Sequence, residues 1–551
     1  MTSRSIRHPL SRLMQEIPAL LPNTQPMPRP LWYLIPLALL VYLACFNSLQ
    51  VGQHVDDASY VMLAQSLLTG HGYSKIAYPD NPPESKYPPL LPLLIAPFLW
   101  LTGGALWATR LPALLCALAS LPVLCTLLRR LLPDQRPWLL LTVVALHPVI
   151  VGYAGMAMTE APSLLLSWAL LLLLLPSLGA LQRRPRRRAS LPASDAAGAR
   201  ASLPASEAVS GAPARLSPKT AAALGFLLGL GLLLRTDTLA LAAAVLLCLL
   251  LSRQWRATLH VLILMLAVYF PWHYHVSHLA ASSGMSYLTE LKTGWWDPSP
   301  LPLRLWHGLT RYAFDALPQM VGLVFGTTLE AKAAALGLAP VITALKITLG
   351  FLVIAGFART WRTFPVVISL FVLIRFAMLV PWPLQTRYLL PLLPFLILYL
   401  LSGLSWLVDR IPRLRFSPRA QHAVLALLLI FALGRDALLV VRPPRLLYPD
   451  LVRGGRMIQE HVPPDAVVAA SWSAKSFYLY SGHTAREVSL SAGPLNPEAL
   501  LKQLGDTRYL LLARGPDDPP RDLAALLHDP RFAVQAEENG LTLLKITQQK
   551  L

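Results

Sequence analysis

About eleven apolar segments, each long enough to cross a lipid bilayer, follow one another between residues 31 and 441. The hydrocarbon core is about 30 Å thick, so a helix that crosses it needs roughly 20 apolar residues. Hydrophobic residues make up 55% of the chain and charged residues only 14%, whereas a soluble protein carries about 25% charged residues. The sequence therefore predicts a polytopic α-helical membrane protein. The segments begin near Leu31, Trp107, Trp138, Pro162, Thr220, Thr238, Ala257, Ala339, Phe364, Tyr388 and His422.

One proline-rich stretch, Pro88–Leu101, decides on which side of the membrane every later loop lies. If this stretch lies in the interface and does not cross, the basic N-terminus and five later basic clusters share one side. Positively charged loops stay in the cytoplasm, so we predict that the N-terminus is inside and the C-terminal region outside. The clusters are Arg129–Arg130, Arg183–Arg188, Arg253–Arg256, Arg359–Arg362 and Arg410–Arg419.

This placement also explains the net charge of +20 without a nucleic-acid partner, because the basic residues lie in short loops between apolar segments. The abundance of Leu, Ala, Arg and Pro is typical of a GC-rich bacterial genome. We therefore expect a multi-pass protein of the bacterial plasma (inner) membrane, surrounded by membrane lipids, whose C-terminal domain faces the periplasm or the cell exterior.

Composition divides the chain into three parts: a cytoplasmic segment at 1–30, a membrane domain at 31–441 and an extracytoplasmic domain at 442–551. A cytoplasmic loop at 182–218 is rich in Ala, Ser, Pro and Arg and is expected to be disordered, without a catalytic role. The cysteines all lie in apolar segments, so neither disulfides nor a zinc site is expected. They are Cys45, Cys116, Cys125 and Cys248.

The C-terminal part has the pattern of a small α/β domain. Two buried strands, two short helices and a terminal hairpin with Asn-Gly at its turn are predicted. The strands are Asp465–Ser471 and Arg508–Ala513, the helices Asn496–Leu504 and Pro520–His528, and the hairpin Phe532–Ile546 around Asn539–Gly540.

Two neighbouring acids, Asp56 and Asp57, follow the first membrane segment. An amphipathic helix along the membrane is expected behind them, because apolar residues recur at helical spacing from Tyr60 to Leu68. An acid at this position could simply cap the helix. Two adjacent acids exceed the need of a cap, however, and a carboxylate in this place suits a general base that takes a proton from an acceptor hydroxyl or amine.

Three further charged residues are predicted on the same outer side: Lys86 before the Pro88–Pro89 pair, Glu160 in a short loop, and Arg387 at the start of a late segment. Charged groups near a bilayer are costly and are functional candidates by default. Lys86 could meet a lipid phosphate or only snorkel to the interface. Glu160 could bind a substrate cation, a metal or a sugar hydroxyl, or cap a helix. Arg387 has the planar fork that suits phosphate or carboxylate. Arg235–Asp237 is interpreted as an internal ion pair.

Together these residues resemble the GT-C membrane glycosyltransferases, namely protein O-mannosyltransferases and lipid A aminoarabinose transferases. The resemblance covers about Trp32 to Leu407, and its motifs are the acidic pair followed by Tyr60, the Lys86 stretch, Glu160 and Arg387–Tyr388. It implies Asp56 as the catalytic base, with Asp57 in the position where the family usually has Glu. Tyr60, Lys86, Glu160, Arg387 and Tyr388 would bind substrate.

The resemblance implies an inverting transfer of a sugar, a hexose or a pentose, from a polyprenyl-phosphate carrier at the outer face of the membrane. The acceptor would be lipid A, another glycan or a protein. Members of the wider fold differ in whether they use a divalent metal, so no cofactor is certain and a metal is left open.

Two other functions compete with this one. A transporter or flippase of a lipid-linked or small polar substrate usually has internal repeats and polar groups near the bilayer midplane. The sequence has no clear repeat of the membrane half and no mid-span acids, and its charges cluster at one interface. A non-catalytic scaffold that binds envelope partners is the other alternative, and it predicts that Asp56 can be replaced without loss of function.

Overall fold

The structure is a computed structural model that describes most of the membrane domain and the C-terminal domain. Nearly all of the predicted cytoplasmic segment at 1–30 and of the loop at 182–218 lies outside the described residues. The described residues are 29–46, 51–52, 54–133, 137–175, 216–283, 291, 294, 297–322, 327–411, 414–441, 449–488, 496–513 and 524–547.

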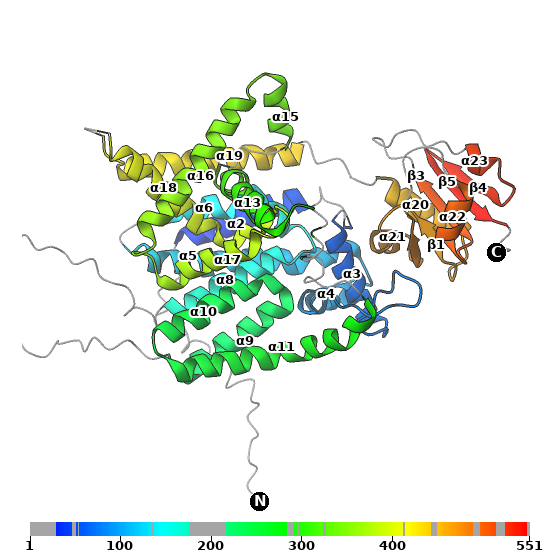
Figure 1. The fold of residues 1–551 in the computed structure, drawn as a ribbon, viewed down its shortest axis with the longest axis horizontal. Coiled ribbons are helices and arrows are strands. Elements are labelled where there is room, and N and C mark those ends of the chain that lie inside the picture. The colour runs from blue at the N-terminus through cyan, green and yellow to red at the C-terminus, as the bar shows by residue number, and fades with distance from the viewer. Residues whose placement is uncertain are drawn as a thin grey trace, which may run out of the picture.

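The membrane domain is a bundle of apolar helices, and one begins near each of the eleven predicted positions (Figure 1). Among the described residues, six helices are long and apolar enough to cross a membrane, and several shorter apolar helices lie between them. The long ones are α2 (Arg29–Phe46), η1 with α5 (Leu106–Leu131), α11 (Trp255–Ser283), α16 (Ala339–Thr360), η5 with α18 (Thr386–Val408) and α19 (Pro418–Val441). The shorter ones include α8 (Glu160–Leu174), α9 (Pro218–Leu234), η3 with α10 (Thr236–Leu251) and α17 (Val366–Leu379).

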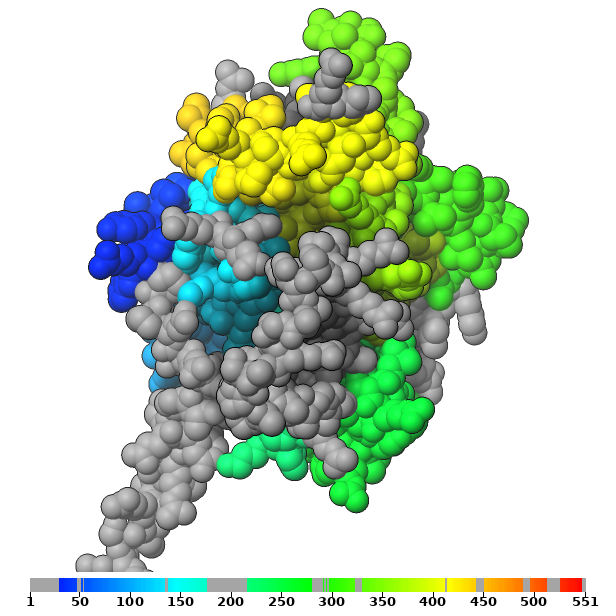
Figure 2. Space-filling view, turned by 90° about the vertical axis from the view of Figure 1, so that its left-hand side faces the viewer, coloured from blue at the N-terminus to red at the C-terminus, as the bar shows by residue number. Residues whose placement is uncertain are grey.

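The predicted segment near Trp138 is broken into two helices, α6 (Trp138–Ala145) and α7 (Pro148–Ala154). Pro148 cannot donate a backbone hydrogen bond and therefore ends the first helix. The buried ring of His147 accepts from the Val149 amide through Nδ1, so Nε2 carries the hydrogen and donates to the Met320 carbonyl at 2.9 Å. The freed carbonyl of Ala145 accepts from the hydroxyl of Tyr42 at 2.7 Å. Helix α19, yellow in Figure 2, is exposed on the face shown there and packs against both of these helices.

The first loop forms two helices, α3 (Val55–Leu68) and α4 (Leu90–Leu101), at the end of the bundle that faces the C-terminal domain (Figure 1). The 12 residues of α4 extend over about 18 Å, less than the bilayer core. Helix α3 differs from the predicted amphipathic helix, because Asp57–Ala64 are buried on every side. It packs against α4 and also against α21 (Ala474–Ser481) of the C-terminal domain, and these contacts cover the face that was expected to meet water.

The remaining helices of the membrane domain follow α11. They are α13 (Leu301–Arg311), the π-helical turn Tyr312–Ala316, α14 (Leu317–Gly322) and α15 (Thr327–Ala335).

The C-terminal domain contains a mixed sheet of five strands in its described part, in the order β2-β1-β3-β5-β4. Strand β1 is parallel to β2 and β3, whereas β5 is antiparallel to β3 and β4. Helices α20 and α21 cover one face, and α22 and α23 lie on the other side of the sheet with a second apolar cluster. The strands are β1 (Val468–Ala470), β2 (Ala485–Glu487), β3 (Tyr509–Ala513), β4 (Phe532–Glu538) and β5 (Leu541–Ile546), and the other helices are α20 (Pro449–His461), α22 (Pro497–Leu504) and α23 (Ala524–Leu527).

Both predicted strands of this domain and its hairpin are confirmed. Asn539 and Gly540 have φ angles of 44° and 82°, the positive values that a two-residue hairpin turn of type I′ requires. Helix α22 begins after Asn496, whose side chain accepts from the amides of Glu498 and Ala499. Helices α20 and α21 and strand β2 are short or amphipathic and were not predicted from the sequence. The four cysteines are free thiols, in agreement with the absence of predicted disulfides.

Close packing of α16 on α18 depends on glycine, and this generates a stability prediction. A Cβ atom added at Gly356 would overlap the carbonyl oxygen of Tyr399, a backbone atom that cannot turn away. We expect Gly356→Ala to destabilise the protein by about 1–3 kcal/mol, the usual cost of overpacking. Thermal unfolding of the purified protein in detergent measures this. Gly434→Ala is the matched control, because no atom lies within 4 Å of its added Cβ, and an equal loss in both variants would contradict the prediction.

Candidate functional site

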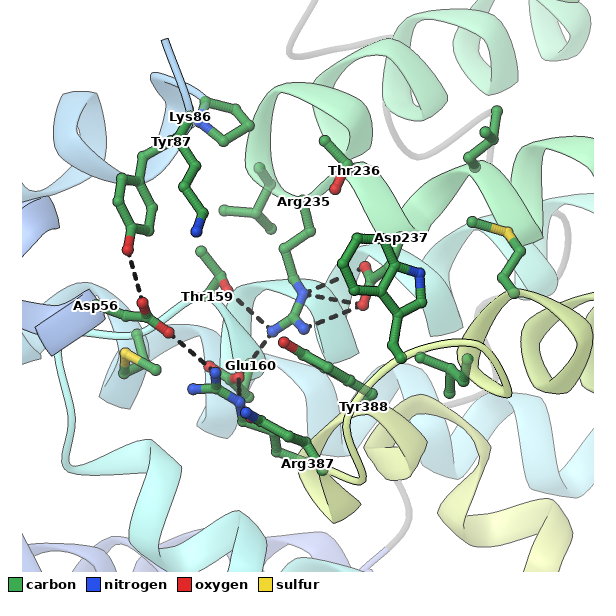
Figure 3. A pocket seen from close by; sticks show the side chains of 18 of the residues that line it. Asp56, Lys86, Tyr87, Thr159, Glu160, Arg235, Thr236, Asp237, Arg387 and Tyr388 are labelled. Carbon is green, nitrogen blue, oxygen red and sulfur yellow. Dashed lines mark hydrogen bonds and ion pairs between the residues drawn. The ribbon is translucent and has the colours of Figure 1, made fainter. Parts of the chain in front are cut away.

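The predicted site residues come together around one cavity of about 590 Å³. Its wall combines charged side chains with aromatic and apolar ones. Six of the seven predicted residues line it: Asp56, Tyr60, Lys86, Glu160, Arg387 and Tyr388. Figure 3 shows the side chain of Lys86 pointing from the first loop into the space between Asp56 and Arg235.

Asp56 lies in the first turn of α3 and receives two hydrogen bonds from distant parts of the chain. The hydroxyl of Tyr87 donates to Oδ1 at 2.7 Å, and Arg387 donates to Oδ2 at 2.9 Å (Figure 3). Burial alone would raise the pKa of Asp56, but the Tyr87 hydrogen bond and the positive charge of Arg387 hold it below its ordinary value. This carboxyl is therefore ionised at neutral pH and can accept a proton.

Asp57 has a different environment and is not among the residues that line the cavity. Its side chain is 2% exposed, and its oxygens accept from the backbone amides of Gly52 and Ala58 at 2.8 Å each. Burial raises its pKa to about 7, against the opposing effect of these two hydrogen bonds. Asp57 thus ties the turn before α3 to the start of the helix.

Glu160 is the first residue of α8 and is almost completely buried. Its Oε1 lies 2.8 Å from Nη1 of Arg235 and 3.6 Å from Nε of Arg387. Within the described part of the chain, Oε2 has no hydrogen-bond partner. A buried acceptor of this kind is costly to leave unmatched, so it is available to a donor group of a bound molecule.

The predicted ion pair of Arg235 and Asp237 is confirmed, at 3.0 Å, and both residues line the cavity. Arg235 follows the last turn of α9 and also donates to the hydroxyl of Thr159. Its guanidinium lies over one part of the Tyr388 ring at 5.1 Å, and that of Arg387 lies at 5.3 Å from the same ring. Cations near an aromatic face are stabilised by its quadrupole, so Tyr388 links the two arginines.

Arg375 is a cavity residue that the sequence analysis did not single out. It lies inside α17 with 2% exposure and contacts Asp237 at 2.7 Å and the carbonyl of Tyr388. The sequence could have pointed to it, because a single arginine in the middle of an apolar segment is a functional candidate.

A second residue was missed in α19. Asp436 is 3% exposed, and neither of its carboxyl oxygens has a hydrogen-bond partner among the described residues. It lies near the end of its helix, away from the residues that line the cavity.

Metal binding was left open by the sequence. In the described residues, no three His, Cys, Asp or Glu side chains are grouped so that they could hold a metal ion.

Comparison with solved structures identifies the fold. ArnT from Cupriavidus metallidurans superimposes with a TM-score of 0.54 in its apo state and 0.53 when bound to undecaprenyl phosphate. In both cases the identity is 12%, and the match covers 93% of this chain and 97% of the other. The chain has the GT-C fold.

The archaeal oligosaccharyltransferase AglB from Archaeoglobus fulgidus, in complex with an inhibitory peptide and a dolichol-phosphate, matches with a TM-score of 0.47 and 12% identity, over 87% of this chain and 69% of its own length. No protein-family model matches the sequence, and no curated protein matches it. The structural comparison with ArnT thus confirms the expected GT-C fold.

The raised pKa of Asp57 predicts a pH dependence of stability. An ordinary aspartate has a pKa near 4, whereas the folded value is about 7. Between these values the unfolded chain loses this proton and the folded chain keeps it, so the contribution of Asp57 to stability falls as the pH rises. We expect the melting temperature of the wild type to fall from pH 5 to pH 8, and to fall less in Asp57→Asn. Parallel curves for the two proteins would contradict this assignment.

Proposed function

We propose that this protein is an inverting glycosyltransferase that moves a sugar from a polyprenyl-monophosphate carrier to an envelope acceptor at the outer face of the membrane. The observation that carries the proposal is the charge of the cavity wall. Among the described residues, four cations and three carboxylates line the cavity, which leaves one excess positive charge. The cations are Lys86, Arg235, Arg375 and Arg387, and the carboxylates are Asp56, Glu160 and Asp237.

This excess matches the donor. A sugar joined to a polyprenyl monophosphate is a phosphodiester with one negative charge, which the cavity would neutralise. After transfer, the carrier is a phosphate monoester with a charge near −2, because the second pKa of such a group is about 6. The proton that Asp56 has taken up leaves the wall with two excess positive charges. The charge of the cavity wall therefore balances the charge of the carrier phosphate both before and after transfer. A diphosphate carrier would bring more negative charge than the wall neutralises, so the monophosphate is favoured.

Lys86 and Arg235 would receive the leaving phosphate, because both line the cavity and Lys86 points into the space between Asp56 and Arg235 (Figure 3). Preorganised cations stabilise charge that develops as a bond breaks. Apolar residues of the same wall, Leu234, Leu239 and Leu379, suit the first part of a lipid tail.

Asp56 would act as the general base. Its low pKa keeps the carboxylate ionised, so it can take the proton from the acceptor hydroxyl or amine as this group attacks the anomeric carbon. The new glycosidic bond forms on the face opposite the phosphate, the bond between carbon and phosphate oxygen breaks, and the configuration inverts. The unmatched Oε2 of Glu160 would accept from a hydroxyl or amino group of the sugar. ArnT, which has the same fold, was solved bound to undecaprenyl phosphate, and this supports the choice of carrier.

The acceptor is an envelope molecule, for which lipid A, another glycan and a protein are the candidates. Mass spectrometry of envelope lipids, glycans and proteins from cells with and without the protein would identify both the donor sugar and the acceptor. A change in transbilayer distribution of a lipid-linked sugar without any new glycosidic bond would instead support a flippase.

Replacing the base tests the proposal directly. We expect Asp56→Asn to lower the rate of sugar transfer by about 10²–10⁴-fold, the usual contribution of general acid–base catalysis, while folding and undecaprenyl phosphate binding persist. The matched control is Asp80→Asn, an exposed acid of the same loop whose positive φ of 65° Asn adopts readily. A fully active Asp56→Asn variant would rule out this residue as the base.

The outer-face orientation can be tested by labelling in whole cells. In a variant without the native cysteines, a cysteine at exposed Asp80 should react with a membrane-impermeant maleimide. A cysteine at Arg256, in a predicted cytoplasmic cluster, should react only after the membrane is opened. The reverse pattern would place the cavity in the cytoplasm and exclude the proposed site of action.

A further inference from the structure

The C-terminal domain contacts the same loop that carries the proposed base. The hydroxyl of Tyr480 donates to the carbonyl of Val51 at 2.6 Å, and that of Ser476 donates to the carbonyl of Gly52 at 2.9 Å. The Gly52 amide in turn donates to Asp57, which is the neighbour of Asp56. The domain therefore lies directly against the start of α3.

A second set of contacts joins the domain to the later part of the loop. The backbone amide of Ala485, in edge strand β2, donates to the carbonyl of Ala77 at 2.8 Å. The hydroxyl of Tyr78 donates to Glu487 at 2.9 Å, and the same carboxylate accepts from the amide of Ala474 at the start of α21. The two sets of contacts hold the loop from both ends, so the domain and the loop form one packed unit.

Glu84 lies in the middle of this unit and is fully buried. Its Oε1 accepts from the consecutive amides of Ser85, Lys86 and Tyr87 at 2.9, 2.6 and 3.3 Å. This carboxylate therefore fixes the backbone that carries Lys86 into the cavity and Tyr87 toward Asp56. Its other oxygen has no hydrogen-bond partner among the described residues. A buried carboxylate in this state requires a nearby positive charge.

Lys475 brings a positive charge close to this backbone from the C-terminal domain. It lies in the first turn of α21, with its Nζ atom 5.2 Å from the centre of the Tyr87 ring. Burial lowers the pKa of Lys475, and the negative charge of Glu84 is the strongest influence in the opposite direction, ahead of Glu487 and Asp56. Lys75 is a second cation that acts on Lys475, and it opposes the charged form.

We infer that Lys475 is a positioning residue of the transferase site, through which the C-terminal domain holds the loop of Lys86 and Tyr87 in its working geometry. Its ammonium lies over the ring of Tyr87 and balances the charge of Glu84. Tyr87 in turn donates to Asp56, and Glu84 accepts from the backbone amide of Lys86. The effect of Lys475 on sugar transfer rests on the proposed function. The contact between the C-terminal domain and the loop is independent of that function.

The inference also gives the C-terminal domain a role. Removing the charge of Lys475 should loosen the three amides that Glu84 binds, so that Lys86 is held less firmly where the carrier phosphate would lie. The substitution changes no residue of the cavity wall. A loss of carrier binding would therefore be transmitted through the loop.

The experiment compares full-length variants in lipid nanodiscs. Lys475→Met removes the charge, Lys475→Arg keeps it, and Lys502→Met is the matched control at an exposed lysine of the same domain. Two quantities are measured: hydrogen–deuterium exchange of peptides that cover residues 84–88, and the Kd for undecaprenyl phosphate. We expect Lys475→Met to speed exchange in these peptides and to weaken carrier binding roughly tenfold, within the usual range of coupling between sites. Lys475→Arg and Lys502→Met should match the wild type.

Glu84→Gln makes the test specific. In this background, adding Lys475→Met should change neither exchange nor Kd much further, because the charge that Lys475 balances is already gone. Unchanged exchange at 84–88 in the single variant Lys475→Met would overturn the inference, and so would increased exchange spread equally over β1, β3 and β5. If the wild type fails to bind undecaprenyl phosphate, the proposed function fails, but the exchange result still decides the role of Lys475.

Discussion

Charges of alternating sign hold the centre of this structure together. Starting from α3 and ending in α17, each side chain of the series contacts the next at 2.9, 3.6, 2.8, 3.0 and 2.7 Å. Charged groups at membrane depth are tolerated only when they are paired, and removing one partner leaves the other buried and uncompensated. The packing of α3, α8, α9, α17 and η5 around one cavity therefore depends on this series. Its members are Asp56, Arg387, Glu160, Arg235, Asp237 and Arg375.

The series also explains how one carboxylate becomes suited to proton transfer while its neighbour does not. Asp56 is at the end of the series, where only one arginine neutralises it and a tyrosine hydroxyl supports its ionised form. Asp57, one residue later, is buried and accepts from the backbone amides of Gly52 and Ala58. A helix turns by 100° per residue, so adjacent acids in α3 belong to different environments although the sequence shows them as a pair.

The sequence predicted the positions of the apolar helices and singled out most of the charged cavity residues, because both depend on local patterns. An apolar segment of about 20 residues seldom forms anything other than a membrane helix. A charged residue next to such a segment usually has a structural or functional role. Asn539–Gly540 identified its hairpin for a similar reason, since few residue pairs adopt the required φ angles.

The features that were missed depend on contacts between distant segments. Nothing near α3 in the sequence indicates that α21 covers it, so the exposed face that was expected is buried. Tyr87 and Lys475 are unremarkable one by one, and their contact joins residues that lie almost 400 positions apart. Arg375 could have been singled out as a lone arginine in an apolar segment, but its pairing with Asp237 of another helix could not be predicted.

The break between α6 and α7 has a consequence for how the bundle finds a single arrangement. In lipid, the transfer of an apolar side chain from lipid to a helix interface gains little free energy. Apolar contacts alone therefore do little to determine which helices pack together. A broken helix exposes backbone and ring groups that must find partners, and here the Ala145 carbonyl selects Tyr42 and the His147 ring selects Met320. The break between α6 and α7 thus fixes the positions of α2 and α14 relative to it through two directional hydrogen bonds.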